Sequence, residues 1–209
     1  NTSSGTQSTI GGGQGNVASA QLATIGGGYF NCASGYRSTI GGGSQNTASA
    51  YSSTINGGLC NNNDSCFSTI GGGFCNLLIC NSCDSFIGNG VCNRIICSLG
   101  SIIGSGSNNY IGVDSVRSFI GAGCNNINYG CCSSISSGYS NYIAPSNGHS
   151  LIGTGSYNCI ESSNLSATIL NGGQNCIDAS GNNYVTILNG NANCNSNPVD
   201  FATTLNGCG

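Results

Sequence analysis

The sequence predicts an all-β parallel β-solenoid, and three observations carry this prediction. A strand-like word recurs at nearly constant spacing, two positions after it never vary, and all extra residues fall at one place in the repeat. The word is Ser-Thr-Ile-Gly-Gly-Gly at 8–13, 38–43 and 68–73, with Ala-Thr-Ile-Gly-Gly-Gly at 23–28 and Ser-Thr-Ile-Asn-Gly-Gly at 53–58. Self-similarity at a fixed period is the sequence signature of stacked repeats.

The third residue of the word marks each repeat and is expected to fill the core. Successive markers are 15 to 18 residues apart, which indicates about 13 turns in a single repeat domain, residues 1–209, expected to be part of a longer chain or fibre. Thr204 holds the marker position in the last copy. The other markers are Ile10, Ile25, Ile40, Ile55, Ile70, Ile87, Ile103, Ile120, Ile135, Ile152, Ile169 and Ile187.

Glycine and asparagine are expected to form the turn that follows each marker. The third residue after the marker is glycine in every copy, and the sixth is asparagine in every complete copy. Glycine permits the positive φ that a sharp reversal needs, and asparagine tolerates the same region. Insertions fall only after this constant segment, so one corner absorbs them, as in solenoids. The predicted turn residues include Gly13, Gly28, Gly43, Gly58, Gly73, Asn16, Asn31 and Asn46.

Each repeat contains two short half-words, which predict two short strands per turn. Ser8-Thr9-Ile10 is echoed by Asn16-Val17-Ala18, and the third residue of both is apolar. Alternation over so few residues is typical of a short strand with one buried face. Stacked turns then give two parallel sheets with rungs about 4.8 Å apart, in a rod roughly 60 Å long. Because the register holds through so many repeats, we expect order although only 4% of the residues are charged.

The repeated words resemble the head repeats of YadA-type trimeric autotransporter adhesins, and similar words occur in viral and phage fibre proteins. The segments that carry the resemblance include Ser-Thr-Ile-Gly-Gly-Gly, Asn-Cys-Ala-Ser-Gly-Tyr-Arg-Ser-Thr-Ile-Gly-Gly-Gly and Asn-Thr-Ala-Ser-Ala-Tyr-Ser-Ser-Thr-Ile-Asn-Gly-Gly. The resemblance implies a left-handed parallel β-roll, three chains side by side, and a surface fibre that adheres to a host or matrix. The chain departs from the family in its longer turns, its asparagine column and its cysteines.

The distribution of apolar residues also predicts a homotrimer. An isoleucine facing an alanine or isoleucine in each rung makes a thin core for 209 residues, and the surplus apolar side chains occupy outward positions. An apolar strip on the flank of a rod usually marks a protein interface, which closed symmetric association buries. The alternative is a monomeric solenoid with an exposed apolar flank. The predicted trimer interface is Phe86, Ile102, Phe119 and Leu151.

The residues that carry enzyme chemistry are nearly missing from the sequence. There is no lysine, and the single histidine, His149, follows a glycine in a loop. No two of the six acids stack in successive turns, as paired-carboxylate catalysis requires. Three arginines make no basic patch, and no run of 18 apolar residues is present. We therefore expect no enzyme, no cofactor, no nucleic-acid partner and no membrane insertion by this segment.

Fifteen cysteines predict a disulfide-reinforced rod matured outside a reducing cytosol. Neighbouring rungs place Cα atoms about 4.8 Å apart, within the reach of a disulfide. Packed reduced thiols are the alternative, and zinc is only hinted at by the lone pair Cys80 and Cys83, so no metal site is predicted. The predicted bonds are Cys66–Cys83, Cys80–Cys97, one within Cys60, Cys75 and Cys92, and one within Cys159, Cys176 and Cys194.

Three functions fit these observations. The first is a structural subunit of an extracellular, cell-surface or virion-surface fibre that assembles with itself as a homotrimer, also end to end. The second is an adhesin head that binds a host glycan or matrix protein through repeated weak contacts. The third is ice binding by the threonine ladder Thr9, Thr24, Thr39, Thr54 and Thr69, which breaks at Phe86 and resumes only at Thr168.

Overall fold

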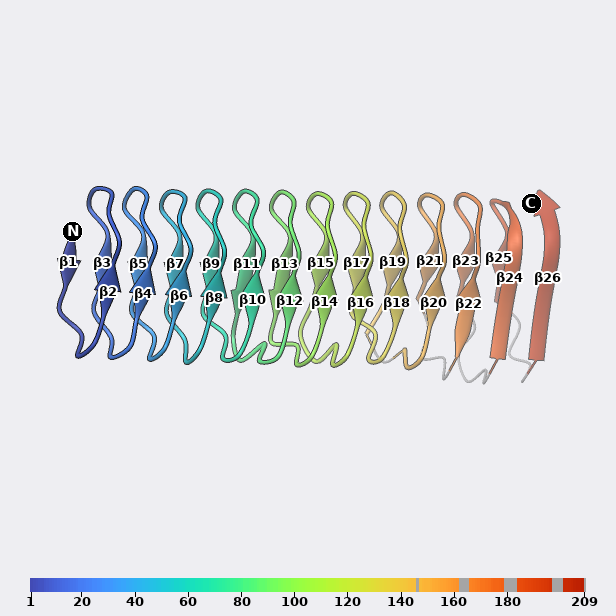
Figure 1. Ribbon diagram of the computed structural model, residues 1–209. Helices are drawn as coiled ribbons and strands as arrows, with labels where there is room; N and C mark the ends of the chain where they lie inside the picture. The colour runs from blue at the N-terminus through green and yellow to red at the C-terminus, as the bar shows by residue number, and fades with distance from the viewer. Residues whose placement is uncertain (146, 162–165, 179–183, 197–200, 209) are drawn as a thin grey trace.

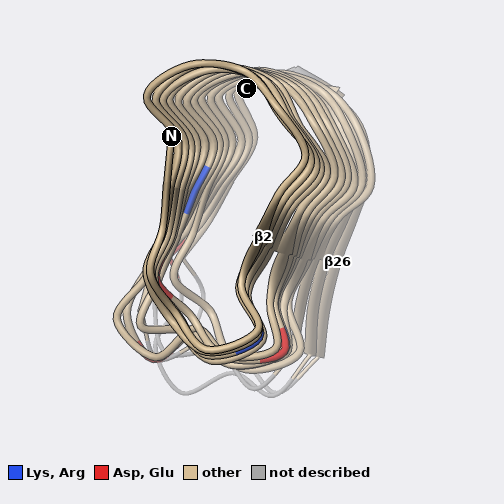
Figure 2. Ribbon diagram, turned by 60° about the vertical axis from the view of Figure 1, so that its left-hand side comes forward, with Lys and Arg blue, Asp and Glu red and all other residues tan. Residues whose placement is uncertain are grey.

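The structure is a computed structural model that describes residues 1–145, 147–161, 166–178, 184–196 and 201–208. In these residues the chain is all-β and forms a parallel β-solenoid, which confirms the predicted class. The turns stack in one line, with the two termini at opposite ends of the rod (Figure 1). Viewed from near the rod axis, successive turns almost superimpose and the two sheets form opposite walls (Figure 2).

The odd-numbered strands form one sheet, called sheet A, which contains 13 strands within the described residues. Its strands are β1 Thr2–Ser3, β3 Val17–Ala18, β5 Cys32–Ala33, β7 Thr47–Ala48, β9 Asn62–Asn63, β11 Leu77–Ile79, β13 Arg94–Ile96, β15 Tyr110–Ile111, β17 Ile127–Asn128, β19 Tyr142–Ile143, β21 Cys159–Ile160, β23 Cys176–Ile177 and β25 Cys194–Asn195.

The even-numbered strands form sheet B, which also contains 13 strands in the described part of the chain. Its strands are β2 Thr9–Ile10, β4 Thr24–Ile25, β6 Thr39–Ile40, β8 Thr54–Ile55, β10 Thr69–Ile70, β12 Phe86–Ile87, β14 Ile102–Ile103, β16 Phe119–Ile120, β18 Ser134–Ile135, β20 Leu151–Ile152, β22 Ala167–Ile169, β24 Tyr184–Asn191 and β26 Phe201–Cys208.

Each strand pairs in parallel with the equivalent strand of the next turn. Ile10 pairs with Ile25, and Ile70 pairs with Ile87 across the first longer turn. The register of the repeat is therefore kept where residues are inserted. A third line of parallel bridges joins the residues four places after each marker, such as Leu59, Phe74 and Val91. We call this line the corner column; the two half-words alone did not predict it.

The core lies between the two sheets. The marker isoleucines from Ile25 to Ile187 are fully buried, and Ile10 in the first turn is partly buried and packs against the core. They face Ala18, Ala33 and Ala48 in the first turns and larger residues such as Leu78 and Ile95 later, all of which are buried. One inward side chain per strand, aliphatic in most strands and an asparagine at Asn63, Asn128 and Asn195, fills the space between two walls this narrow.

The asparagines do not occupy the turn conformation that the sequence suggested. Positive φ falls on the glycine three places after the marker, such as Gly28 at +100°, and on the residue five places after it, such as Cys92 at +55°. Asn16, Asn31 and Asn46 lie in the same corner but are buried and have ordinary φ angles. Their amides face inward because they stand two residues before an inward apolar residue, and alternate residues share a face.

Buried amides form a hydrogen-bonded ladder along the whole rod. The backbone N–H and the Nδ2 of Asn31 both donate to Oδ1 of Asn16, at 2.9 and 3.1 Å. The same Nδ2 also donates to the carbonyl oxygens of Gly27 and Gly43, at 3.1 and 3.0 Å. This pattern satisfies a polar group that would otherwise be costly to bury, and it ties each turn to both neighbours.

The glycine three places after the marker is required by this packing. A Cβ on Gly28 would stand 2.1 Å from the carbonyl oxygen of Gly43 and 2.8 Å from Nδ2 of Asn31. The glycine therefore permits both the positive φ and the close approach of the next turn. The invariance of glycine and that of asparagine have one cause, since both residues build the same corner.

Candidate functional site

The outer face of sheet B carries a single column formed by the residue before each marker. It changes from threonine in the first turns to a run of three large apolar side chains on consecutive rungs. Phe86, Ile102 and Phe119 are 40%, 39% and 37% exposed. We call these three residues the apolar segment. Leu151 lies on the same column, is partly buried, and is separated from the segment by Ser134.

The two phenylalanine rings of the apolar segment lie against the glycines that directly follow their strands. A Cβ on Gly88 would meet the Phe86 ring at 3.3 Å, and one on Gly121 would meet the Phe119 ring at 3.2 Å. Because Phe86, Ile102 and Phe119 are register partners on consecutive rungs, they form a continuous exposed apolar column. Such a surface usually marks a protein interface.

The threonine part of the column is also in register. Thr9, Thr24, Thr39, Thr54 and Thr69 pair rung to rung. This ladder places one threonine hydroxyl on each of five consecutive rungs.

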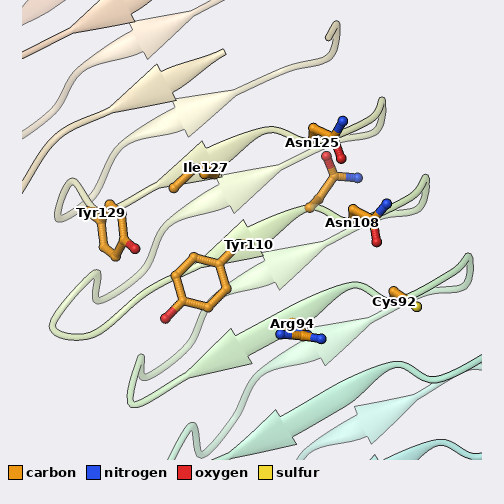
Figure 3. A pocket seen from close by; sticks show the side chains of 8 residues that line it. Cys92, Arg94, Asn108, Tyr110, Asn125, Ile127 and Tyr129 are labelled. Atoms are coloured by element: carbon orange, nitrogen blue, oxygen red, sulfur yellow. The ribbon is translucent and has the colours of Figure 1, made fainter. Parts of the chain in front are cut away.

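Sheet A carries a hollow of about 530 Å³ on its outer face (Figure 3). Its walls come from three consecutive turns, those of β13, β15 and β17. The hollow combines a guanidinium, amides and phenol rings, so it can make hydrogen bonds and also stack on a flat apolar face. The lining residues are Cys92, Arg94, Asn108, Asn109, Tyr110, Asn125, Ile127 and Tyr129.

Three tyrosines form a connected cluster at one side of this hollow. The ring centroids of Tyr110 and Tyr129 are 5.5 Å apart with planes at 67°, and those of Tyr129 and Tyr142 are 6.1 Å apart at 71°. These edge-to-face contacts fix the rings. Burial and the neighbouring Tyr129 raise the pKa of Tyr110, while the charge of Arg94 acts in the opposite direction.

The cysteines stack as the repeat spacing predicts. Cys159, Cys176 and Cys194 are register partners on β21, β23 and β25. Burial raises the pKa of Cys75, and its contacts with Cys60 and Cys92 add to the shift. Burial likewise raises the pKa of Cys83 beside Cys66, and a hydrogen bond with Cys80 raises that of Cys97.

No disulfide joins the 14 cysteines whose side chains the structure describes, all of which are free thiols. The predicted bonds Cys66–Cys83 and Cys80–Cys97, and one bond in each three-cysteine stack, are therefore not confirmed and stay predictions. The pKa of Cys159 is raised by the neighbouring thiol of Cys176, by burial and by Glu161, to whose Oε1 the Cys159 thiol donates a hydrogen bond at 3.2 Å. The neighbouring Cys159 in turn lowers the pKa of Cys176. The Sγ atoms of the sequence neighbours Cys131 and Cys132 are 3.6 Å apart.

Within the described segments, no group of three or more His, Cys, Asp or Glu side chains has the arrangement of a metal site. Charged residues are few, and most lie at the corner where the turns differ in length (Figure 2). None of the described segments is a helix long and apolar enough to cross a membrane.

Comparison with protein-family models and with curated proteins finds no match to this chain. The description of the fold and of these surfaces is therefore supported by the sequence repeat and the structure alone. The likeness to adhesin head repeats rests on the repeated words and supplies only expectations.

Proposed function

We propose that this protein is a structural subunit of an extracellular or virion-surface fibre and assembles as a parallel homotrimer of left-handed β-rolls. The apolar segment of sheet B supports this proposal above all other features. Its three large side chains lie on consecutive rungs and are each more than a third exposed. Burying them between chains removes apolar surface from water, at about 25 cal/mol per Å².

The geometry of the rod suits a parallel assembly. Every chain repeats the same rung spacing along its length, so equivalent columns of three chains can stay in register over many turns. Phe86, Ile102 and Phe119 of one chain would then meet their own copies, with Leu151 extending the contact toward the C-terminal end. Closed cyclic symmetry buries such a column without leaving an open surface for unlimited association.

The internal ladders also fit a structural role. Each turn is bonded to the next by two sheets, by the corner column and by buried asparagines. Stability in such a rod accumulates turn by turn through nearest-neighbour contacts. A long particle can therefore be built from small, uncharged residues with little core.

The experiment is analytical ultracentrifugation of the wild-type chain and two triple variants. The first, Phe86→Ser, Ile102→Ser and Phe119→Ser, removes the apolar segment. The second, Leu59→Ser, Phe74→Ser and Val91→Ser, removes three side chains of equal exposure, 39%, 43% and 43%, from the corner column.

We expect a wild-type trimer that persists in the corner-column variant and dissociates to monomers in the apolar-segment variant. A wild-type monomer at micromolar concentration would overturn the proposal. So would a trimer that survives loss of the apolar segment but dissociates when the corner column is changed. Circular dichroism on all three proteins verifies that the solenoid itself is intact.

A further inference from the structure

We propose that the hollow on sheet A is a binding site for an acidic saccharide, that is, a sugar ring that carries a carboxylate. The site belongs to the opposite wall from the apolar segment (Figure 2). It therefore stays open when chains pack through sheet B, and it does not depend on that packing.

The hollow is built by a regular feature of the corner. Cys92, Asn108 and Asn125 stand five places after their markers and have φ angles of 55°, 54° and 58°. Each is followed by a buried asparagine and then by an outward strand residue. The corner residue and the strand residue of one turn therefore line the same side of the wall, which makes a trough between the two columns (Figure 3).

A single glycine makes room for the aromatic wall of this trough. Gly112 and Tyr129 follow the inward residues Ile111 and Asn128 of adjacent rungs, so they are the same repeat position on neighbouring turns. A Cβ on Gly112 would stand 2.2 Å from the Tyr129 ring. The ring thus occupies the space that a side chain at 112 would fill, where it contacts Tyr110. The aromatic wall is held in place before any ligand arrives.

Arg94 supplies the charge. It is exposed on β13, directly beside Tyr110 in the register of sheet A. No described acidic side chain forms a salt bridge with Arg94. Arg37, by contrast, makes a cation–π contact, with its guanidinium carbon 5.1 Å from the centre of the Tyr36 ring. An arginine guanidinium presents a planar fork of donors that matches a carboxylate in two parallel hydrogen bonds.

These groups together define the ligand class. A pyranose ring offers an apolar face of C–H groups to a phenol ring, hydroxyls to side-chain amides, and, when acidic, a carboxylate to a guanidinium. The hollow holds all three kinds of partner: the Tyr110 and Tyr129 rings, the amides of Asn108 and Asn125, and Arg94. Its volume of about 530 Å³ lies within the range of small-molecule sites. A single-stranded nucleic acid would need a line of cations, and this trough has one.

The test is calorimetric titration with an oligosaccharide of glucuronic acid and with the same oligosaccharide after reduction of its carboxylates. The variants are Arg94→Gln, Tyr110→Leu and, as the control with an equal loss of charge, Arg117→Gln. Arg117 is exposed at the corner of variable length, outside the hollow. Arg94 is exposed, so its replacement leaves the fold intact.

We expect the wild type and Arg117→Gln to bind the acidic sugar equally. Arg94→Gln is expected to weaken that binding about tenfold or more, because a hydrogen-bonded charge pair is lost. Tyr110→Leu is expected to weaken binding of both the acidic and the reduced sugar. Equal binding of the two sugars by the wild type, unchanged binding by Arg94→Gln, or no binding at millimolar sugar would each overturn the proposal. Arg94-dependent binding of an acidic peptide, without binding of the sugar, would assign the hollow to a different ligand.

Discussion

The first turns, residues 8–73, and the middle turns, residues 86–160, share one repeat and have different surfaces. Both keep the glycine and asparagine of the corner and the inward isoleucine of each marker. The first turns show threonine on the outer column of sheet B, whereas the middle turns show the apolar segment. Only the middle turns contain the hollow. The scaffold is thus encoded by inward residues, and the outward columns are free to acquire a function.

The two regions also differ in how they are held together inside. In the middle turns a second ladder appears, in which the serine two places before each marker accepts a hydrogen bond from the next turn. The backbone N–H of Ser101 donates to Oγ of Ser85 at 3.0 Å, and that of Ser118 donates to Oγ of Ser101 at 3.0 Å. In the first turns Ser38 Oγ is buried without a partner. Buried isoleucines such as Ile111 face the markers where the first turns have alanine, which adds about 0.8 kcal/mol per buried CH₂.

The largest expected effect is on the free energy of unfolding, and we expect it in both regions. Replacing Asn46 or Asn109 by Ala removes a buried amide that bonds to both neighbouring turns. Because buried partners are left unsatisfied at about 1–3 kcal/mol each, we expect either variant to lose roughly 3–6 kcal/mol in the free energy of unfolding. Urea denaturation measures the loss.

Gln45→Ala is the matched control, since Gln45 is the sequence neighbour of Asn46 and is not buried. It should change the free energy of unfolding by under about 1 kcal/mol. A cost below about 1 kcal/mol for both asparagine variants would show that the ladder accompanies the fold without stabilising it.

Disulfides come next, and the cysteines expected to form them run from the end of the first turns, at Cys60 and Cys66, through the middle and last turns. Cys66–Cys83, Cys80–Cys97 and one bond in each three-cysteine stack are expected to form when an oxidant such as oxidised glutathione accepts the two electrons and two protons. The central residues Cys75 and Cys176 contact both neighbours of their stacks, so we expect each to take part. Each bond should add about 2–4 kcal/mol.

Non-reducing peptide mapping of the oxidised protein identifies the bonds. If every thiol is still alkylated after oxidation, the cysteines serve as small packed side chains instead. In the reduced protein Cys176 should be alkylated at lower pH than Cys159. The pKa of Cys159 is raised by the neighbouring Cys176, by burial and by its hydrogen bond to Glu161, whereas the neighbouring Cys159 lowers the pKa of Cys176. Equal pH profiles for the two thiols would contradict this order.

A smaller effect separates the serine positions of the two regions. Ser101→Ala leaves the backbone N–H of Ser118 without its acceptor, and we expect a loss of about 1–3 kcal/mol. Ser38→Ala removes a hydroxyl that has no hydrogen-bond partner, so it should be neutral or slightly stabilising. Thermal unfolding of the two variants compares them directly. Equal destabilisation would mean that the serine ladder is not what distinguishes the middle turns.

The sequence was sufficient for the fold and insufficient for the site. Fixed spacing of the markers predicts which residues stack, and the sheets follow from that. A buried amide ladder and a left-handed turn both demand an invariant asparagine, so the invariance of Asn31 does not tell them apart. Its position two residues before the inward Ala33 is the signal that favours the ladder. The spacing of Ile103 and Ile120 makes Gly112 and Tyr129 equivalent, but register does not specify side-chain conformation, so it does not show that the Tyr129 ring lies over Gly112 and lines a hollow.

The smallest effect is expected from the threonine ladder of the first turns. Thr9 to Thr69 present one hydroxyl per turn over five turns, and the apolar segment then replaces them. Because the ladder is a single row rather than a two-dimensional array, and is broken from Phe86 until Thr168, we expect no thermal hysteresis beyond that of an ordinary solute. Nanolitre osmometry on the wild type and on Thr39→Lys checks this, since Thr39 is at the centre of the ladder. Hysteresis in the wild type that disappears in Thr39→Lys would make the first turns an ice-binding surface, and the two regions would then differ in ligand as well as in packing.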